Sequence, residues 1–577
     1  MTVAAETPFV VLKFGGTSVA RAERWKVIAS LVDDRCAAGL KPVLVCSALS
    51  GVSDQLIQLI DDALDGRHRA GLDALRQTHQ TLADALGVAL PEAVSAQLAF
   101  LSRMAEGVHL VGEVSPRLRA RVLACGELMS TALGVATLRA RGLDAVWQDA
   151  RDLLTTLDAP ELPAAQRYLQ ATCDAGRDDL LRSRLAEVGS VIVTQGFIAR
   201  QPGTGDTALL GRGGSDTSAA VLAARLDAVR CEIWTDVPGL FTANPKSVPS
   251  ARLLRSVDFD EAQELASMGA KVLHPRCIPP VRAAGIPLSV HCTPRPDLPG
   301  SLIGSGGSSP GLKAVSSRAG VTLVSMETVG MWHKPGFLAA AFGVFADLSL
   351  SIDLVATSET SVTVTLDPGQ AAIDPSVLHT LLARLAPICR AEARTDLTAV
   401  SLVGTGIRGI LHRLAPVFEL FEEQRVHLLS QAANDLNLTV VVDADQADRL
   451  LGQLHGVLLS EVEGAAWLGA SWTALMEPGD ASTAPVERPG TWWSAAVDAL
   501  LEEAGRGTPA YVYSGEAVTD AARRLMALST PDAVLYAMKA NPHPDLLARI
   551  VAEGLGVGGV ELNMGELAWG VGRGEVT

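Results

Sequence analysis

Val10-Val11-Leu12-Lys13-Phe14-Gly15-Gly16-Thr17-Ser18-Val19 is an apolar run that ends in a lysine, two glycines and two hydroxyl residues. This pattern predicts a buried strand, a glycine turn and then a helix. The paired glycines would let backbone N–H groups approach a ligand, and Lys13 adds a positive charge, so the stretch suits a phosphate group. Junctions of this kind also occur for conformational reasons alone. On this stretch alone, both interpretations stay open.

The segments that follow predict a parallel sheet. Residues 21–38 have helical periodicity, and residues 42–48 form a second apolar run that ends in small and hydroxyl side chains. A strand, a helix and a strand in this order are typical of a βαβ unit. Further short strands are expected at residues 191–194 and 232–235. We therefore expect one large α/β domain over residues 1–310.

Size and composition limit the class of protein. A chain of 577 residues is too long for one hydrophobic core. Its net charge of −16 argues against nucleic acid or an anionic membrane as a main partner. The eight cysteines are scattered without a Cys-x-x-Cys pair, as expected for reduced thiols. No apolar run reaches the ~18 residues of a membrane span, and the N-terminus lacks a signal-peptide pattern, so we expect a cytoplasmic protein.

The pattern changes after residue 310, where a small βαββα-type unit occurs twice. We expect two α+β domains, at residues 311–395 and 396–475, because tandem copies are more typical of a ligand-sensing pair than of a catalytic site. Residues 476–490 are rich in proline and glycine and predict a linker. A further globular segment is expected over residues 491–577.

Charged side chains follow several of the predicted strands, and an open α/β sheet brings such loops to one edge. The planar guanidinium of Arg212 suits a carboxylate and the side chain of Glu127 suits an ammonium group, which together describe an amino acid. Lys13 and Lys271 suit polyphosphate. Each of these residues taken alone is equally consistent with an ordinary surface charge. The chain has no Walker A sequence and no protein-kinase triplets, so phosphoryl transfer would need another architecture.

Several motifs surround these residues: Lys13-Phe14-Gly15-Gly16-Thr17-Ser18, Ser47-Ala48-Leu49-Ser50-Gly51-Val52-Ser53, Gly126-Glu127-Leu128-Met129-Ser130, Gly211-Arg212-Gly213-Gly214-Ser215-Asp216, Trp234-Thr235-Asp236-Val237-Pro238-Gly239 and Gly269-Ala270-Lys271-Val272-Leu273-His274-Pro275. In this order they closely resemble the aspartate kinase family, and the resemblance spans about residues 8–475. It implies an amino acid kinase fold that transfers the γ-phosphoryl group of Mg-ATP to the side-chain carboxylate of L-aspartate, giving 4-phospho-L-aspartate.

By this resemblance Lys13 and Asp216 form the catalytic pair. The implied aspartate-binding residues are Ser53, Glu127, Arg212 and Ser215. The implied ATP-binding residues are Lys13, Gly15, Gly16, Ser47, Thr235, Asp236, Phe241, Lys246 and Lys271, and no metal ligand is implied. Ser53, Phe241 and Lys246 stand where the family more often has threonine, tyrosine and arginine. The carboxylate of aspartate is already ionised at pH 7, so the nucleophile needs no general base, and Asp216 is expected to orient lysines.

The two repeats resemble paired ACT domains of the lysine-sensitive subgroup, which implies feedback inhibition by L-lysine in a homodimer or larger assembly. The implied lysine-binding residues are Met331, Gly336, Phe337, Leu338, Ser351, Ile352, Asp353, Ser358 and Glu359. Asp353 and Glu359 are expected to pair with the amino groups of lysine, while the backbone that starts a helix at Gly336 receives its carboxylate. The apolar members of this set are equally consistent with core packing.

The last segment holds two stretches, Thr508-Pro509-Ala510-Tyr511-Val512-Tyr513 and Tyr536-Ala537-Met538-Lys539-Ala540-Asn541-Pro542, that resemble the opening of diaminopimelate decarboxylase. The resemblance implies that Lys539 forms the Schiff base with pyridoxal phosphate at the start of a (β/α)8 barrel. Such a barrel takes about 250 residues, so residues 491–577 supply only its first strands, and we expect no decarboxylase activity from them.

The leading interpretation is a lysine-regulated aspartate kinase fused to an incomplete decarboxylase. A non-catalytic lysine-sensing scaffold with a degenerate kinase domain is the alternative from another class, and a decarboxylase with a vestigial kinase half is a third. The presence of Lys13, Arg212 and Asp216 argues against the scaffold. The short last segment argues against the third.

Overall fold

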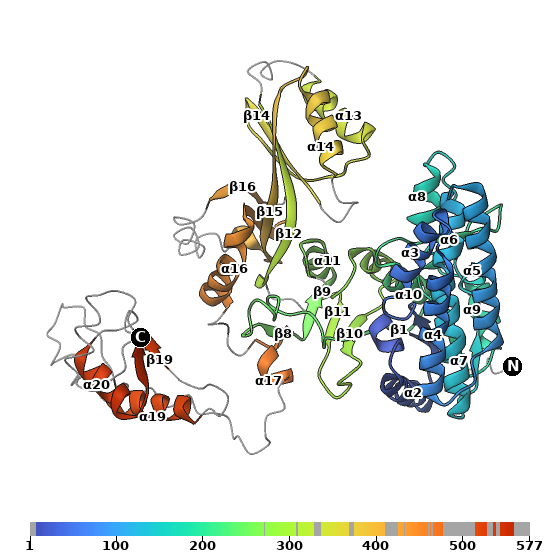
Figure 1. The fold of residues 1–577 in the computed structure, drawn as a ribbon, viewed down its shortest axis with the longest axis horizontal. Coiled ribbons are helices and arrows are strands. Elements are labelled where there is room, and N and C mark those ends of the chain that lie inside the picture. Colours follow the sequence, from blue (N-terminus) through green and yellow to red (C-terminus); the bar gives the residue numbers. More distant parts are fainter. Residues whose placement is uncertain are drawn as a thin grey trace. The chain divides into compact units, whose positions relative to one another are not determined.

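The computed structural model describes residues 7–270, 272–306, 310–327, 336–367, 374–409, 425–431, 433–459, 462, 465–476, 514–527, 535–537 and 543–558. The chain divides into two compact units, Met1–Glu477 and Pro478–Thr577, and each is described by itself (Figure 1).

An eight-stranded sheet forms the centre of the first half of unit one, in the order β3-β4-β2-β1-β7-β10-β11-β9. In that order the strands are Ala145–Trp147, Val191–Gln195, Lys41–Cys46, Phe9–Phe14, Cys231–Thr235, Leu288–Cys292, Ser301–Gly304 and Ser256–Asp258. Neighbours are parallel from β3 through to β10, β11 runs antiparallel to β10, and β9 is parallel to β11. The predicted parallel α/β sheet is therefore confirmed, with the Val10–Val19 stretch supplying its middle strand.

Helices cover both faces of this sheet (Figure 1). They are α1 (Gly16–Val19), α2 (Ala22–Ala37), α3 (Val52–Leu64), α4 (Arg69–Leu86), α5 (Glu92–Val111), α6 (Pro116–Leu123), α7 (Cys125–Ala140), α8 (Ala164–Leu169), α9 (Asp179–Ala186), α10 (Gly214–Arg225), α11 (Phe259–Ser267) and α12 (Ile278–Ala283), with 3-10 turns η1 (Ala150–Asp152) and η2 (Pro275–Cys277). Leu12 and Phe14 pack with α2 to α7, whereas Val11 packs with α9 to α12. The alternation of side chains along β1 thus feeds two separate cores.

One stretch of the described residues, Pro116–Ala140, has the length and hydropathy of a membrane span. It comprises α6 and α7, and 78% of its apolar window is buried inside the protein. It also contains the buried carboxyl group of Glu127. A core helix of a globular domain gives the same signal, so this stretch is weak evidence for a membrane.

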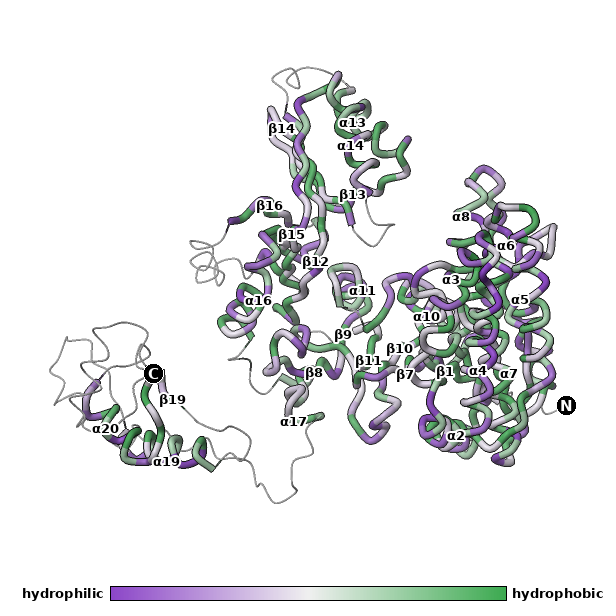
Figure 2. Tube along the Cα trace, in the orientation of Figure 1, coloured by the Kyte–Doolittle hydropathy of each residue, from purple (hydrophilic) through white to green (hydrophobic). Residues whose placement is uncertain are grey.

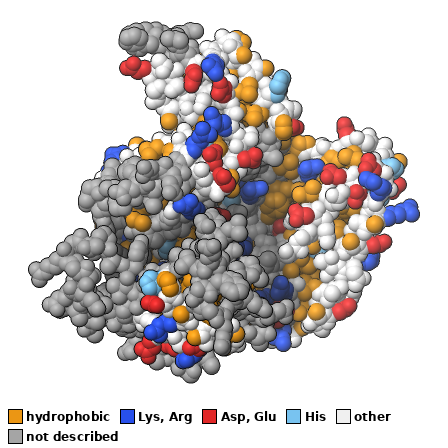
Figure 3. Space-filling model, turned by 60° about the vertical axis from the view of Figure 1, so that its left-hand side comes forward, with side chains coloured by type: hydrophobic (Ala, Val, Ile, Leu, Met, Phe, Trp, Pro, Cys, Tyr) orange, Lys and Arg blue, Asp and Glu red, His pale blue; other side chains and the backbone are white. Residues whose placement is uncertain are grey.

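Charged side chains are mixed on the surface, and the cysteines are mostly buried. On the face drawn in Figure 3, acidic and basic side chains of the described residues are interspersed. All eight cysteines lie among the described residues and are unpaired, and all but Cys36 are buried. The structure therefore contains no disulfide framework.

A second, antiparallel sheet follows in the order β13-β14-β12-β15-β17-β16. Its strands in that order are Ile352–Thr357, Ser361–Leu366, Gly311–Glu327, Arg390–Thr405, Asn437–Asp443 and Val426–Gln431. Its helices are α13 (Phe337–Asp347), α14 (Pro375–Leu385) and α16 (Ala444–Leu459). Figure 2 shows that α13 is hydrophobic over most of its length.

The two repeats share their longest strands. The first half of β12 pairs with the second half of β15, from Gly311–Thr405 to Ala319–Thr398, while the second half of β12 pairs with β14. The expected boundary between residues 395 and 396 lies inside β15. The helix expected at residues 410–422 lies outside the described residues. Each half of the second sheet is therefore built from strands of both repeats, because β12 and β15 run through both halves.

The second sheet contacts α11 and the turn that follows it. Thr405 Oγ1 donates to Glu261 Oε1 at 2.7 Å, and Ser316 Oγ donates to the Met268 carbonyl at 2.9 Å. Gly269 has φ +113°, and a Cβ there would lie 2.3 Å from the Ser317 carbonyl oxygen. The chain leading to Lys271 is therefore packed directly against β12.

The remaining elements are short. A hairpin joins β5 (Ile198–Arg200) to β6 (Thr207–Leu209), and β8 (Arg252–Leu254) pairs with β18 (Leu468–Ser471), which precedes α17 (Trp472–Met476). Unit two contains α19 (Gly515–Met526), β19 (Leu535–Ala537), α20 (Pro544–Ala552) and β20 (Gly556–Gly558). Because β19 and β20 are parallel, the described residues of unit two contain a βαβ connection through α20.

Candidate active site

The predicted loops meet at one edge of the central sheet. Phe14 is in register with Cys46 on one side and with Trp234 on the other, and Thr235 is in register with Cys292. These are the carboxyl ends of parallel strands, where open α/β folds bind ligands. The residues after each strand, including the glycine turn after β1, therefore face a common space.

Lys13 and Asp216 come together at this edge. Lys13 Nζ lies 2.6 Å from Asp216 Oδ1, and the two side chains are only 11% and 13% exposed. Lys13 is the last residue but one of β1, while Asp216 lies in the first turn of α10. A poorly hydrated ammonium group held in this way keeps a strong local field. The expected pair is therefore present as an ion pair.

The glycine turn is packed so tightly at Gly16 that only glycine fits there. A Cβ on Gly16 would lie 2.8 Å from the carbonyl oxygen of Ala48, and the Ser50 N–H donates to the Gly16 carbonyl at 3.2 Å. The Ser47 N–H likewise donates to the Phe14 carbonyl at 3.1 Å. The turns after β1 and β2 therefore form one structure.

Glu127 lies on the other side of Ala48. Its side chain begins in the first turn of α7 and the residue is 3% exposed. Oε1 accepts a hydrogen bond from the Ala48 N–H at 3.1 Å, whereas the buried Oε2 has no hydrogen-bond partner among the described residues. Burial raises the pKa of the carboxyl group to about 8. A buried polar atom without a partner is uncommon in proteins and marks Oε2 as a point for a ligand donor.

The remaining residues of the implied aspartate set lie at helix starts or in loops. Ser215 is in the first turn of α10, and a Cβ on Gly196 would lie 2.6 Å from its side chain. Ser53 is in the first turn of α3 and is exposed. Arg212 is exposed in the loop before α10, so its guanidinium is available to solvent or a ligand.

The implied nucleotide residues divide into two groups. Thr235 Oγ1 donates to Asp236 Oδ1 at 3.1 Å at the end of β7, and Asp236 lines a small pocket of about 130 Å³. Lys246 is exposed in the following loop. Phe241, by contrast, is 8% exposed and packs edge-on against Trp472, with ring centroids 5.4 Å apart. The structure does not bring that ring to the open edge, and Lys271 lies outside the described residues.

Two residues that the sequence analysis assigned no role touch the Arg212 loop. A Cβ on Gly213 would lie 2.0 Å from Cγ of His274, and Arg276 donates to the Leu210 carbonyl at 2.5 Å. His274 belongs to the last of the quoted motifs, which ends at Pro275, and Arg276 follows directly after it. Because His274 lies in that motif and Arg276 directly follows it, the motif was the sequence signal that could have pointed to both residues.

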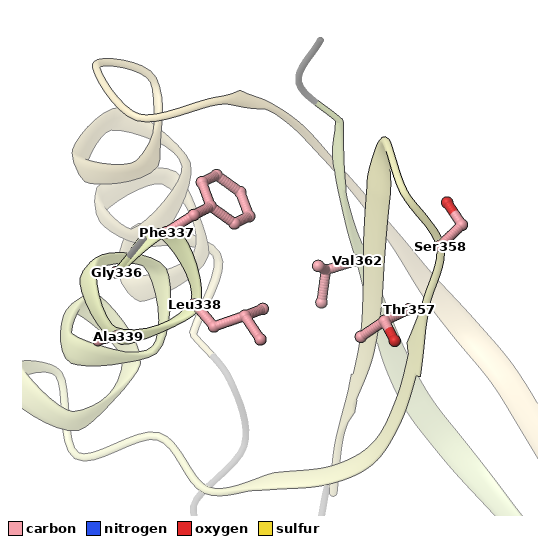
Figure 4. A pocket seen from close by; sticks show the side chains of 7 residues that line it. All are labelled: Gly336, Phe337, Leu338, Ala339, Thr357, Ser358 and Val362. Atoms are coloured by element: carbon pink, nitrogen blue, oxygen red, sulfur yellow. The ribbon is translucent and has the colours of Figure 1, made fainter. Parts of the chain in front are cut away.

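A separate pocket of about 480 Å³ lies between α13 and the β13–β14 turn (Figure 4). The described residues that line it are Gly336, Phe337, Leu338, Ala339, Thr357, Ser358 and Val362. Phe337 and Leu338 point toward Val362 across the pocket. Four residues of the implied lysine set are thus brought together: Gly336, Phe337, Leu338 and Ser358.

The other implied lysine-binding residues are not in the lining. The carboxylate of Asp353 is paired with Arg318, which also lies 3.3 Å from Asp367. Ser351, Ile352 and Glu359 are absent from the described lining, and Met331 lies outside the described residues. Pairing with Arg318 neutralises Asp353, so the carboxylate does not present a free charge to the pocket.

Comparison with known proteins places the fold and site in one class. The amino acid kinase family profile matches residues 8–291. Among curated proteins, lysine-sensitive aspartokinase 3 of Escherichia coli (strain K12) is 35% identical over 454 residues, covering 78% of this chain and 99% of the relative. Chloroplastic aspartokinase 2 of Arabidopsis thaliana is 31% identical, covering 77% and 83%. The fold is that of an amino acid kinase.

Solved structures give the same result. E. coli aspartokinase III in complex with aspartate and ADP (R-state) matches with a TM-score of 0.69 at 33% identity, covering 78% of this chain and 99% of that chain. The same enzyme in complex with lysine and aspartate (T-state) matches with a TM-score of 0.64. The chain belongs to the aspartokinase family.

Proposed function

We propose that this protein transfers the γ-phosphoryl group of ATP to the side-chain carboxylate of L-aspartate, giving 4-phospho-L-aspartate. The observation that carries the proposal is that Ala48 contacts both the glycine turn and Glu127. Its carbonyl oxygen packs against the glycine turn at Gly16, and its N–H holds Glu127. The turn proposed to bind phosphate and the carboxylate proposed to bind the ammonium group therefore both contact one residue.

In the proposed mechanism, the aspartate side chain attacks the phosphoryl group without a general base, since it is already ionised at neutral pH. Glu127 Oε2 receives the substrate ammonium group and Arg212 receives the α-carboxylate. Lys13 neutralises charge on the transferring group, together with the Mg²⁺ that enters with ATP. Asp216 holds the Lys13 ammonium at 2.6 Å and so fixes its direction.

The test is to trap the acyl phosphate as a hydroxamate after incubation with aspartate and Mg-ATP. We expect hydroxamate with aspartate and none without ATP. A folded protein that gives no hydroxamate would instead be the lysine-sensing scaffold with a degenerate kinase domain.

We propose further that L-lysine inhibits this reaction by binding at the α13 pocket. Gly336, at φ +86°, caps the N-terminus of α13, whose free N–H groups suit a carboxylate. The E. coli relative is named lysine-sensitive. A homodimer or larger assembly is part of this proposal, because α13 is apolar and Leu338 on it is 43% exposed.

Asp353→Ala is expected to raise the lysine concentration for half-inhibition by about tenfold, the usual effect of losing one charged contact. In this proposal the lysine side chain displaces Arg318 from Asp353, so removing the carboxylate removes that contact. The measurement is hydroxamate formation against lysine concentration. Asp347→Ala is the matched variant, because Asp347 pairs with Arg384 at the other end of α13. Equal inhibition curves for wild type and Asp353→Ala would exclude this role.

We propose, finally, that unit two is the start of a pyridoxal-phosphate decarboxylase barrel like that of diaminopimelate decarboxylase. The parallel β19–β20 pair joined through α20 supports it, because such barrels are built from βαβ units. Of the two stretches that carry the resemblance, only Tyr536 and Ala537 are described, and Lys539 lies outside the described residues.

Borohydride reduction in the presence of pyridoxal phosphate tests this assignment on the full chain. We expect mass spectrometry to find the pyridoxyl group on Lys539 ahead of other lysines, because a lysine at a barrel-strand end is placed for the Schiff base. Lys539→Arg should then abolish the preferred label. Even labelling across surface lysines would refute the assignment.

A further inference from the structure

Arg276 joins two segments that lie far apart in the sequence. It is in η2, and its Nη1 donates to the Leu210 carbonyl at 2.5 Å. Its Nη2 donates to the Ala171 carbonyl at 2.8 Å and to Thr172 Oγ1 at 3.3 Å. Hydrogen bonds from a charged donor are stronger than those between neutral groups. One guanidinium therefore fastens Leu210 to the 171–172 segment.

Leu210 itself is anchored, because it is buried, its N–H donates to the Phe197 carbonyl at 2.8 Å, and the preceding Leu209 carbonyl accepts from the Ala171 N–H at 2.9 Å. The residues that follow Leu210 are less constrained. Gly211 and Gly213 have φ of +71° and +67°, and such residues are conformationally permissive. Within the loop, the Gly214 N–H donates to the Gly211 carbonyl at 3.0 Å. The ring of His274 packs against Gly213 from the same side as Arg276. His274 and Arg276, which lie outside the loop, therefore help to determine the path of its backbone.

We propose that Arg276 is a positioning residue that sets the angle at which Arg212 meets the α-carboxylate of aspartate. The proposal rests on the aspartate kinase function proposed above. Arg212 lies two residues after the carbonyl that Arg276 holds, and its own side chain is exposed. Without the tether, the Leu210 carbonyl loses its charged donor and the glycines on either side of Arg212 let the backbone there shift, and a shift of about 1 Å at a substrate-orienting group is enough to cost up to a hundredfold in rate.

The first experiment compares Arg276→Met with Arg276→Lys by steady-state kinetics. Arg276→Met is expected to raise the KM for aspartate by about tenfold, with the KM for ATP changed by less than about twofold, because only the acceptor side depends on Arg212. Arg276→Lys keeps a charged donor group, so its KM for aspartate should lie between those of wild type and Arg276→Met. Arg282→Met is the matched control, since Arg282 on α12 is half exposed and pairs with Asp260.

A second measurement does not depend on activity. Arg212 is an exposed trypsin site, so cleavage after Arg212 should be several times faster in Arg276→Met than in wild type or Arg282→Met. A lower melting temperature with unchanged KM values and unchanged cleavage at Arg212 would overturn the proposal. If the wild type makes no hydroxamate, the proposed function fails, while the cleavage rates still report whether Arg276 tethers the loop. Arg276→Lys supplies both readouts if Arg276→Met does not fold.

Discussion

Lys13→Met is expected to lower kcat for aspartate phosphorylation by about 10²- to 10³-fold, the usual effect of removing one preorganised group that stabilises transition-state charge. Lys13 Nζ is held 2.6 Å from Asp216 and is nearly excluded from solvent, so no other group takes over its position. Methionine keeps most of the volume and loses only the charge. The readout is initial rate at saturating aspartate and Mg-ATP.

Two further variants separate lost catalysis from lost structure. Lys26→Met changes an exposed lysine on α2 and should leave kcat within about twofold, as surface substitutions usually do. Lys13→Met/Asp216→Asn should be no slower than Lys13→Met alone, because Asp216 acts through Lys13. A folded Lys13→Met protein with kcat within threefold of wild type would rule out the electrostatic role.

Glu127→Gln is expected to raise the KM for aspartate by about ten- to a hundredfold, the range for a hydrogen bond to a charged group. Glutamine has nearly the same shape and can still accept the hydrogen bond from the Ala48 N–H. It cannot pair with an ammonium group through a charge. The KM for ATP should change little, because Glu127 lies on the acceptor side of Ala48.

The same residue predicts a pH dependence with a definite sign. Burial raises the pKa of Glu127 to about 8, so in the free enzyme the carboxyl group is mostly protonated at pH 7. The substrate ammonium needs the carboxylate, so binding releases a proton and is favoured by higher pH. The KM for aspartate should therefore fall as pH rises toward 8 and level off above it.

Rate measurements at low aspartate from pH 6.5 to 9 check this dependence. Glu127→Gln should show no such fall in KM. Glu92→Gln is the matched control, because Glu92 is also an acidic residue in the first turn of a helix but is exposed. A wild-type KM that is constant over this range would show that the ionisation of Glu127 is not linked to aspartate binding.

The sequence predicted the central strand and its glycine turn, for reasons that are local. The uninterrupted apolar run that contains Val11 and Leu12 predicts a strand buried on both faces. The glycines after Phe14 predict a tight turn. Lys13 is placed by the pairing of β1, but Asp216 reaches it because α10, which follows the separate β5–β6 hairpin, packs against β1. The acceptor and phosphate residues could be named because each belongs to a short motif.

Other residues were decided by packing between distant segments. Phe241 follows a nucleotide-like motif, yet Trp472 covers its ring. Asp353 has the right charge for lysine, yet Arg318 from β12 already pairs with it. Trp472 and Arg318 lie far along the chain from Phe241 and Asp353, so no local sequence pattern predicts these contacts.

By itself, then, the sequence determined the parallel α/β sheet, the glycine turn after β1 and the amino acid kinase motifs, because strand periodicity and turn chemistry act over a few neighbouring residues. Only the tertiary structure decided the ionisation of Glu127, the sharing of β12 and β15 between the repeats, and the tether from Arg276 to Leu210 and Ala171. These depend on burial and on contacts across 66 and 105 residues of chain, which the folded protein alone brings together.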